Sequence, residues 1–544
     1  MIKKQIKHGL NFFWEKFHKN SIWFHIVGII AIIWFLVRVV PKPDRIRYPC
    51  QQMAILSATS YIAFWVVLWS AMFHGAALWI RKVKTKSAKF TPVLLVSLVI
   101  SFSLSSIVFA ENTTLENPAP TPWNPVSKDP IGTPTGLNPG RVVWVWNPNA
   151  TKQTLLSFWW KEENNDQNVI NEMFSQGIKS LSGKPNEIES WDAIFKYFNE
   201  KYGNKIGSYQ TGEKIAIKIN MNNCWQTGSY KRIDNERDAS PYVVNALLNQ
   251  LINVVGVNQE DIYIYDASRV IANWFYERVV THFPNVNFVD STGGAEGRIK
   301  VEKSTEKIYF ADSQGLIRTL PTVVTDAKYL INMPLLKRHP IDYGVTFSGK
   351  NFFGTWIESV AEVHDYHRAA FTSGNPAPQT DLLAHSQIGG KTLLFIGDGT
   401  FATKIDHSTI GKFNMKPFNR DWTNSLFFSQ DPVALDSVMY DFLYTEGCNP
   451  CEGSQNYLHQ CAEPLENTYD PEGDRIYLSE SLGVHEHWDT SIDIFSSERY
   501  TGIDFIALGE EHVNAKSVEF KLIHGNLFLK LISKYPFFQR LLKI

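Results

Sequence analysis

Four polar side chains in one part of the chain have types that suit acid–base chemistry and anion binding. Lys337 and His339 are two residues apart, and Lys350 and Asn351 follow after a glycine-containing loop. A lysine provides a point charge for a phosphate or carboxylate, and an asparagine orients it by hydrogen bonding. A lysine buried beside another cation has a lowered pKa and can act as a base. We therefore expect these four side chains to border one pocket.

Further polar residues stand where apolar segments end. Lys218 and Asn220 close one segment, Asp266 closes a second, and Asp398 follows a third. If the segments are parallel strands, a ligand binds beyond their carboxyl ends. We expect Lys218 and Asn220 to bind it, and Asp266 or Asp398 to act with the lysines as their counter-charge. The alternative is that Lys218 and Lys350 are ion-paired with these aspartates and bind no ligand.

Two pairs of histidines have spacings that suit a metal ion. His364 and His367 are three residues apart, which places both on one face of a helix. His485 and His487 alternate along an extended segment and also share a face. Either pair can supply two ligands to a divalent metal, with carboxylates completing the coordination shell. The alternative is that these histidines are surface or hydrogen-bonded side chains.

The cysteines argue against an iron–sulfur cluster. The chain has 5 Cys, and Cys448, Cys451 and Cys461 follow the pattern C-x₂-C-x₉-C, which is one thiolate short of a full ligand set. In an oxidising compartment, a disulfide among these three or a structural role is favoured instead.

Alternating strands and helices must position these side chains. Strands are predicted at residues 141–146, 214–220, 261–266, 287–290, 329–332 and 392–396. Helical patterns lie between them, and two helices have clear start signals at Ser240-Pro241 and Asp431-Pro432. We expect Asp431 to be a helix N-cap rather than a ligand. The pattern is typical of an α/β fold, with a mainly parallel sheet covered by helices on both faces.

The first 110 residues have a different composition. Three apolar segments are long enough to span the ~30 Å core of a bilayer and predict transmembrane helices at about 21–40, 53–80 and 90–109. Basic residues gather in 1–20 and 81–89, which places both in the cytoplasm. Residue 111 onward is then extracytoplasmic. The alternative for the third segment is a signal peptide that is cleaved after Ala110.

Three regions follow from this organisation. Residues 1–110 form the membrane region, 111–140 a proline-rich linker, and 141–544 an extracytoplasmic α/β domain. The formal net charge is −1, so no basic surface for nucleic acid is expected. The expected partners are the membrane and a small anionic ligand.

Several polar and glycine-rich segments occur together, and two are the most specific: Leu330–His339 and Gly344–Gly354. The others are Lys218–Asn220, Tyr265–Arg269, Ile396–Gly399 and Asp431–Asp436. Together they resemble the domain of unknown function 362 family over about residues 210–445. The resemblance implies the fold and the location of the site but no reaction. Members linked to iron–sulfur chemistry carry a ferredoxin-like run of cysteines, which this chain lacks.

Two classes of function are consistent with these residues. In the first, the domain is an enzyme that acts on an anionic small molecule or envelope component through the Lys/His/Asn cluster, with or without a metal. In the second, it is a non-catalytic ligand-binding or envelope-assembly module in which the same cluster holds a ligand. We favour the enzyme. A pocket into which Lys337, His339 and Lys350 all point is expected under either class.

Overall fold

The computed structural model describes residues 129–513 except for 154–156, 204, 226, 295, 312–314, 340–344, 346, 357–374 and 448–451. These residues all belong to the second of two units, Glu116–Ile544. The predicted transmembrane segments at 21–40, 53–80 and 90–109 lie outside the described residues. Within the described part, no helix is both long and apolar enough to cross a membrane.

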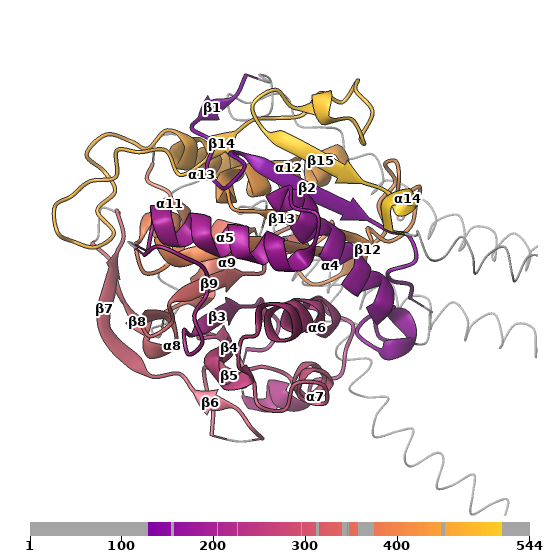
Figure 1. Ribbon diagram of the computed structural model, residues 1–544, viewed down its shortest axis with the longest axis horizontal. Helices are drawn as coiled ribbons and strands as arrows, with labels where there is room; N and C mark the ends of the chain where they lie inside the picture. The colour runs from indigo at the N-terminus through magenta and orange to yellow at the C-terminus, as the bar shows by residue number, and fades with distance from the viewer. Residues whose placement is uncertain are drawn as a thin grey trace, which may run out of the picture. The chain divides into compact units, whose positions relative to one another are not determined.

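An 11-stranded sheet forms the centre of the described part (Figure 1). Its strands are β2 (Arg141–Trp146), β3 (Ile215–Lys218), β4 (Ile262–Asp266), β5 (Asn287–Asp290), β6 (Ile299–Lys300), β9 (Tyr329–Asn332), β10 (Leu335–Lys337), β11 (Thr392–Thr403), β12 (Ile410–Gly411), β13 (Ser425–Ser429) and β15 (Asp504–Leu508). The main order is β15-β2-β13-β11-β9-β3-β4-β5-β6, and β10 and β12 both pair with β11. The pairs of β13 and β12 are antiparallel, whereas the other pairs of this sheet are parallel. The prediction of a mainly parallel sheet is confirmed.

Two short ladders lie outside this sheet. β1 (Ile131–Gly132) pairs with β14 (Val484–His485), and β7 (Lys303–Tyr309) pairs with β8 (Ile317–Pro321). The backbone N–H of Thr135 also donates to Asp431 Oδ2 at 2.9 Å. The last part of the segment predicted as a linker is thus held against the α/β domain.

The helices of the described part follow from the same alternating pattern. They are α4 (Gln167–Ser182), α5 (Glu187–Lys201), α6 (Pro241–Gln250), α7 (Asn273–Val280), α8 (Thr322–Thr325), α9 (Ser348–Asn351), α11 (Pro378–Ala384), α12 (Pro432–Thr445), α13 (Glu452–Ala462) and α14 (Glu510–Val513). The Asp431 side chain accepts hydrogen bonds from the backbone N–H groups of Val433 and Ala434, which confirms it as the N-cap of α12.

Helices cover both faces of the sheet. On β2, Val143 and Val145 belong to one hydrophobic core, which also contains buried residues of α4, α5, α6 and α7. Their neighbours Val142 and Trp144 belong to a second core with residues of α11, α12 and α13. Because successive side chains of a strand point to opposite faces, each face of the sheet has its own core. The strands are therefore fixed in position, and the polar residues at their ends are held by rigid elements.

Candidate functional site

The carboxyl ends of β3 and β4 bring two predicted site residues into contact. The strands are parallel, with Lys218 opposite Tyr265, so Lys218 and Asp266 end neighbouring strands. Lys218 Nζ lies 3.1 Å from Asp266 Oδ2 and also donates to the carbonyl of Ile219 at 2.5 Å. Burial lowers the pKa of Lys218, although the Asp266 carboxylate acts in the opposite direction. The ion pair predicted as the alternative for Lys218 is therefore present.

A chain of asparagines links the ends of β3 and β9 to α9. Asn220 Nδ2 donates to Asn351 Oδ1 at 3.0 Å, and Asn351 Nδ2 donates to Asn332 Oδ1 at 2.7 Å. Asn332 Nδ2 in turn donates to the carbonyl of Ser348 at 3.0 Å, at the start of α9. These hydrogen bonds fix α9 relative to the ends of β3 and β9. They consequently also fix the backbone that carries Lys350.

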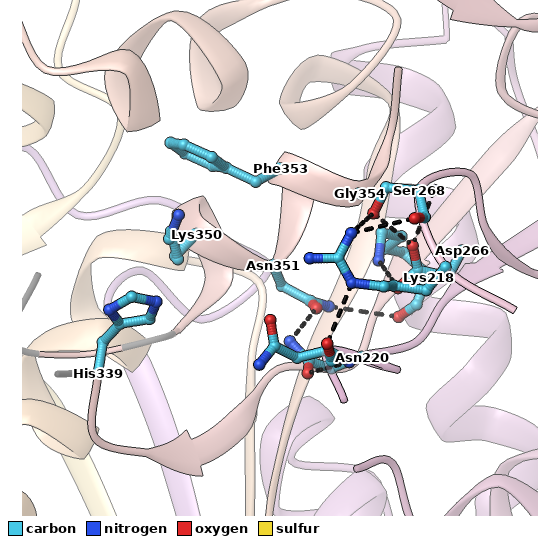
Figure 2. A pocket seen from close by; sticks show the side chains of 11 residues that line it. Lys218, Asn220, Asp266, Ser268, His339, Lys350, Asn351, Phe353 and Gly354 are labelled. Atoms are coloured by element: carbon cyan, nitrogen blue, oxygen red, sulfur yellow. Dashed lines mark hydrogen bonds and ion pairs between the residues drawn. The ribbon is translucent and has the colours of Figure 1, made fainter. Parts of the chain in front are cut away.

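Lys350 and His339 lie at the same cavity as these residues. The Lys350 side chain is buried, and its Nζ lies 3.6 Å from the centroid of the Phe353 ring. Figure 2 shows Lys350 between the rings of Phe353 and His339. Burial lowers the pKa of Lys350 well below its usual value, and the charge of Arg269 lowers it further. A lysine with a lowered pKa can act as a general acid or base.

The cavity is small and polar. Its volume is about 40 Å³, which is room for roughly three water molecules. Six predicted residues line it: Lys218, Asn220, Asp266, His339, Lys350 and Asn351. We call this cavity the pocket. A group of the size of a carboxylate or phosphate fits inside it, whereas a whole nucleotide does not.

Arg269, which was not predicted as a site residue, also lines the pocket. Its Nε donates to the carbonyl of Asn222 at 3.1 Å, and its Nη1 donates to the carbonyl of Ser268 at 3.0 Å. The face of the guanidinium stacks on the Trp225 ring at 4.0 Å. Within the described part of the chain, Nη2 of Arg269 donates no hydrogen bond and the guanidinium has no ion pair. The group is thus held rigidly with one donor nitrogen uncommitted.

Asn222, Ser268, Phe353 and Gly354 are the other pocket residues that sequence reasoning missed. Ser268 and Arg269 follow directly after β4, inside a segment that carries the family resemblance. A signal was therefore available: both stand within three residues of the strand end that was already assigned to the site. Phe353 and Gly354 likewise follow Lys350 and Asn351 closely.

Two residues predicted for the pocket, Lys337 and Asp398, do not line it. Both are buried in a neighbouring group of charges that we call the Arg237 network: Arg237, Asp238, Lys337 and Asp398. Arg237 Nη2 lies 2.7 Å from Asp398 Oδ2, and Lys337 Nζ donates to the carbonyl of Arg237 at 3.2 Å. Burial lowers the pKa of Lys337 to about 8, against the attraction of Asp238. Lys337 and His339 are two residues apart, but β10 ends at Lys337 and His339 lies beyond the strand end.

The predicted metal ligands that the structure describes have hydrogen-bond partners in the protein. His485 Nδ1 lies 2.8 Å from Ser437 Oγ, and His487 Nδ1 lies 2.7 Å from Asp441 Oδ1. Gln455 contacts the other ring nitrogen of His487 at 2.9 Å. In the described residues no group of three or more His, Cys, Asp or Glu is arranged to hold a metal ion. The other predicted pair, His364 and His367, lies outside the described residues.

The cysteine pattern is described only at its last member. Cys461 is a free, buried thiol whose Sγ lies 3.4 Å from Thr380 Oγ1. A disulfide that includes Cys461 is therefore not formed. Cys448 and Cys451 lie outside the described residues.

Comparison with known proteins places this site within a family. No curated protein matches the chain. Residues 215–441 match a family model described as Domain of unknown function (DUF362), with nearly the bounds expected from the resemblance. The match includes Lys218, Asp266, Arg269, His339 and Lys350. This part of the chain, which contains the pocket, is therefore a member of the DUF362 family.

Proposed function

We propose that the pocket binds the anionic group of a small molecule and that the domain is an enzyme acting on that molecule. The observation that carries the proposal is the state of Arg269. Two backbone carbonyls and the Trp225 ring fix its guanidinium, while Nη2 has no protein partner within the described residues. A guanidinium fixed in advance loses little conformational freedom when it binds a carboxylate or phosphate.

The charges around the pocket support an anionic ligand. Among the basic side chains buried at this edge, Lys218 pairs with Asp266 and Arg237 pairs with Asp398. Arg269 is also buried, but among the described residues no carboxylate lies within ion-pair distance of it. Buried cations are costly without a counter-charge. A bound anion would supply the counter-charge of Arg269.

The enzyme is favoured over the binding module because of Lys350. A module that only holds an anion gains most from a lysine that stays charged. Burial and Arg269 instead favour the neutral amine of Lys350. A group with a pKa shifted in this way, inside a cavity beside His339, is suited to accept or donate a proton during a reaction.

The location of the activity is part of the proposal. The three apolar N-terminal segments and the basic residues beside them support a membrane anchor with the α/β domain on the extracytoplasmic side. Reporter fusions at residue 85 and after residue 140 should give opposite signals. The same signal from both would refute this topology.

Anion binding is tested on the full-length protein in detergent with inorganic phosphate and acetate as probes. Either anion should raise the melting temperature in a saturable way. Arg269→Gln should weaken binding about 10- to 100-fold, because a hydrogen bond to a charged group contributes about 1.5–3 kcal/mol. Arg269→Lys should bind the anions more weakly than the wild type but more tightly than Arg269→Gln, since a lysine keeps the charge but loses the planar fork.

Arg141→Gln is the matched control. Arg141 begins β2, at the edge of the sheet opposite to the pocket, and pairs with Asp504 at 2.7 Å. This variant should bind the probes like the wild type. If neither anion stabilises the wild type, or if Arg269→Gln binds both as well as the wild type does, the proposed site is refuted.

A further inference from the structure

Lys350 is a primary amine on the wall of the pocket, in surroundings that lower its pKa. Its Nζ packs over the Phe353 ring at 3.6 Å, and Arg269 is the neighbouring cation that acts on it. The aromatic ring favours the charged form of the amine. Burial opposes this and, together with the charge of Arg269, lowers the pKa of Lys350 well below its usual value.

The other lysines near this edge are less suited to react. Lys218 lines the pocket, but its Nζ is held by Asp266 and by the carbonyl of Ile219. Lys337 donates to the carbonyl of Arg237 and does not line the pocket. Lys350 combines a place on the pocket wall with proximity to the anion-binding guanidinium of Arg269.

We propose that Lys350 is a nucleophile that forms a Schiff base with the carbonyl carbon of a small oxo acid, whose carboxylate is bound by Arg269. This inference rests on the proposed function and names its substrate class. A desolvated lysine beside a second cation is the usual setting for amine nucleophiles of this kind. The small volume of the pocket, about 40 Å³, favours a small oxo acid over a larger molecule.

The reaction is balanced without any oxidant or reductant. The lone pair of Lys350 Nζ forms a bond to the carbonyl carbon, and one of the two nitrogen protons is transferred to the carbonyl oxygen, which gives a neutral carbinolamine. Loss of the nitrogen proton and of the hydroxyl group as water then gives the imine. His339, which lines the same pocket, is placed to transfer these protons. Protonation of the imine nitrogen gives an iminium ion, and addition of water to its carbon followed by loss of the amine returns Lys350 and the oxo acid.

Trapping of the imine tests this proposal. The full-length protein is incubated at pH 7 with glyoxylate or pyruvate and sodium cyanoborohydride, which reduces an imine to a stable secondary amine. Peptide mass mapping then gives the rate of labelling at each lysine. We expect Lys350 to be labelled at least about 10-fold faster than exposed lysines, which are less than about 0.1% neutral at this pH. Phosphate should slow the labelling by occupying Arg269.

Three variants make the result specific. Lys350→Arg should lose the fast label while keeping its melting temperature within a few degrees of the wild type. Lys337→Arg and Lys391→Arg should keep it, although burial lowers the pKa of both Lys337 and Lys391 to about 8. If Lys350 is not labelled preferentially, yet phosphate still binds through Arg269, the Schiff base is refuted and the anion site stands. If phosphate does not bind either, the proposed function fails as well.

Discussion

Two groups of buried charges lie at the carboxyl edge of the sheet, and they differ in how completely the protein satisfies them. In the Arg237 network, Nε, Nη1 and Nη2 of Arg237 each have a protein acceptor, from Phe401, Asp238 and Asp398. Both oxygens of Asp398 also accept hydrogen bonds. In the pocket, Arg269 keeps Nη2 uncommitted within the described residues, and a cavity lies beside it.

This difference separates a structural cluster from a candidate site more reliably than burial or charge does. A buried donor that has no acceptor costs about 1–3 kcal/mol, and more if it is charged. A fold can avoid this cost by adding an acceptor, as it does around Arg237. Where it instead leaves a cavity beside a rigid guanidinium, water or a ligand must accept the remaining hydrogen bond.

The largest effect is expected in the Arg237 network, from Asp398→Ala. The substitution leaves the fully buried Arg237 without its carboxylate partner, which lies at 2.7 Å. Breaking a buried ion pair in this way costs about 3–5 kcal/mol. Denaturant unfolding of the wild type and the variant measures this loss. If Asp398→Ala costs less than about 1 kcal/mol, the network does not have the structural role assigned to it.

Asp192→Ala provides the control for that experiment. Asp192 pairs with Lys196 at 2.7 Å on the surface of α5, with both side chains about half exposed. Exposed pairs of this kind contribute about 0–1 kcal/mol. A similar loss in both variants would remove the distinction between a saturated buried pair and an ordinary surface pair.

A second test concerns Lys337 and the pH dependence of stability. Burial lowers the pKa of Lys337 to about 8, below its usual value of 10.5. Between these two pH values the unfolded chain binds more protons than the folded protein, so folding becomes more favourable as the pH rises. The difference in pKa corresponds to about 3 kcal/mol.

Lys337→Met removes the titration of Lys337 and leaves every other lysine in place. The free energy of unfolding of the wild type should therefore increase by up to about 3 kcal/mol relative to the variant between pH 8 and 10.5. Denaturant unfolding at several pH values measures the difference. Parallel curves for the two proteins would contradict a buried, desolvated Lys337.

Much of the site's framework was predictable from the sequence because strands end where apolar runs meet polar residues. Lys218 and Asp266 close their strands as expected, and parallel pairing of β3 with β4 brings them together. The N-cap of α12 was equally predictable, since Asp431 precedes a proline at the first helical position. These features depend on local sequence and on the period of the strands.

The division of the charges between the two groups was not predictable. Lys337 and His339 are two residues apart, but β10 ends at Lys337, which lies in the Arg237 network, whereas His339 lines the pocket. Arg269 stands close to a strand end that was assigned to the site, but its importance depends on acceptors from Asn222 and Ser268, which the sequence does not indicate. Such contacts depend on tertiary packing and cannot be predicted from the spacing of residues in the sequence.

The smallest of the expected effects concerns Gly354, where the backbone passes close to the pocket's ion pair. A Cβ atom on Gly354 would lie 2.6 Å from Asp266 Oδ1 and 2.8 Å from Lys218 Nζ. Gly354→Ala must therefore push the pair apart. Strain from an added methyl group in a packed site costs about 1–3 kcal/mol.

The same substitution should also weaken phosphate binding, because Asp266 Oδ1 holds the Ser268 backbone N–H at 3.1 Å, directly before Arg269. Gly390→Ala is the matched control, since its added Cβ would meet its nearest atoms at 3.6 Å, an ordinary contact. Unfolding and phosphate titration of both variants measure the two effects. A stable Gly354→Ala protein with unchanged phosphate affinity would mean that the ion pair does not position Arg269. The pocket and the Arg237 network would then be less distinct than their hydrogen bonds indicate.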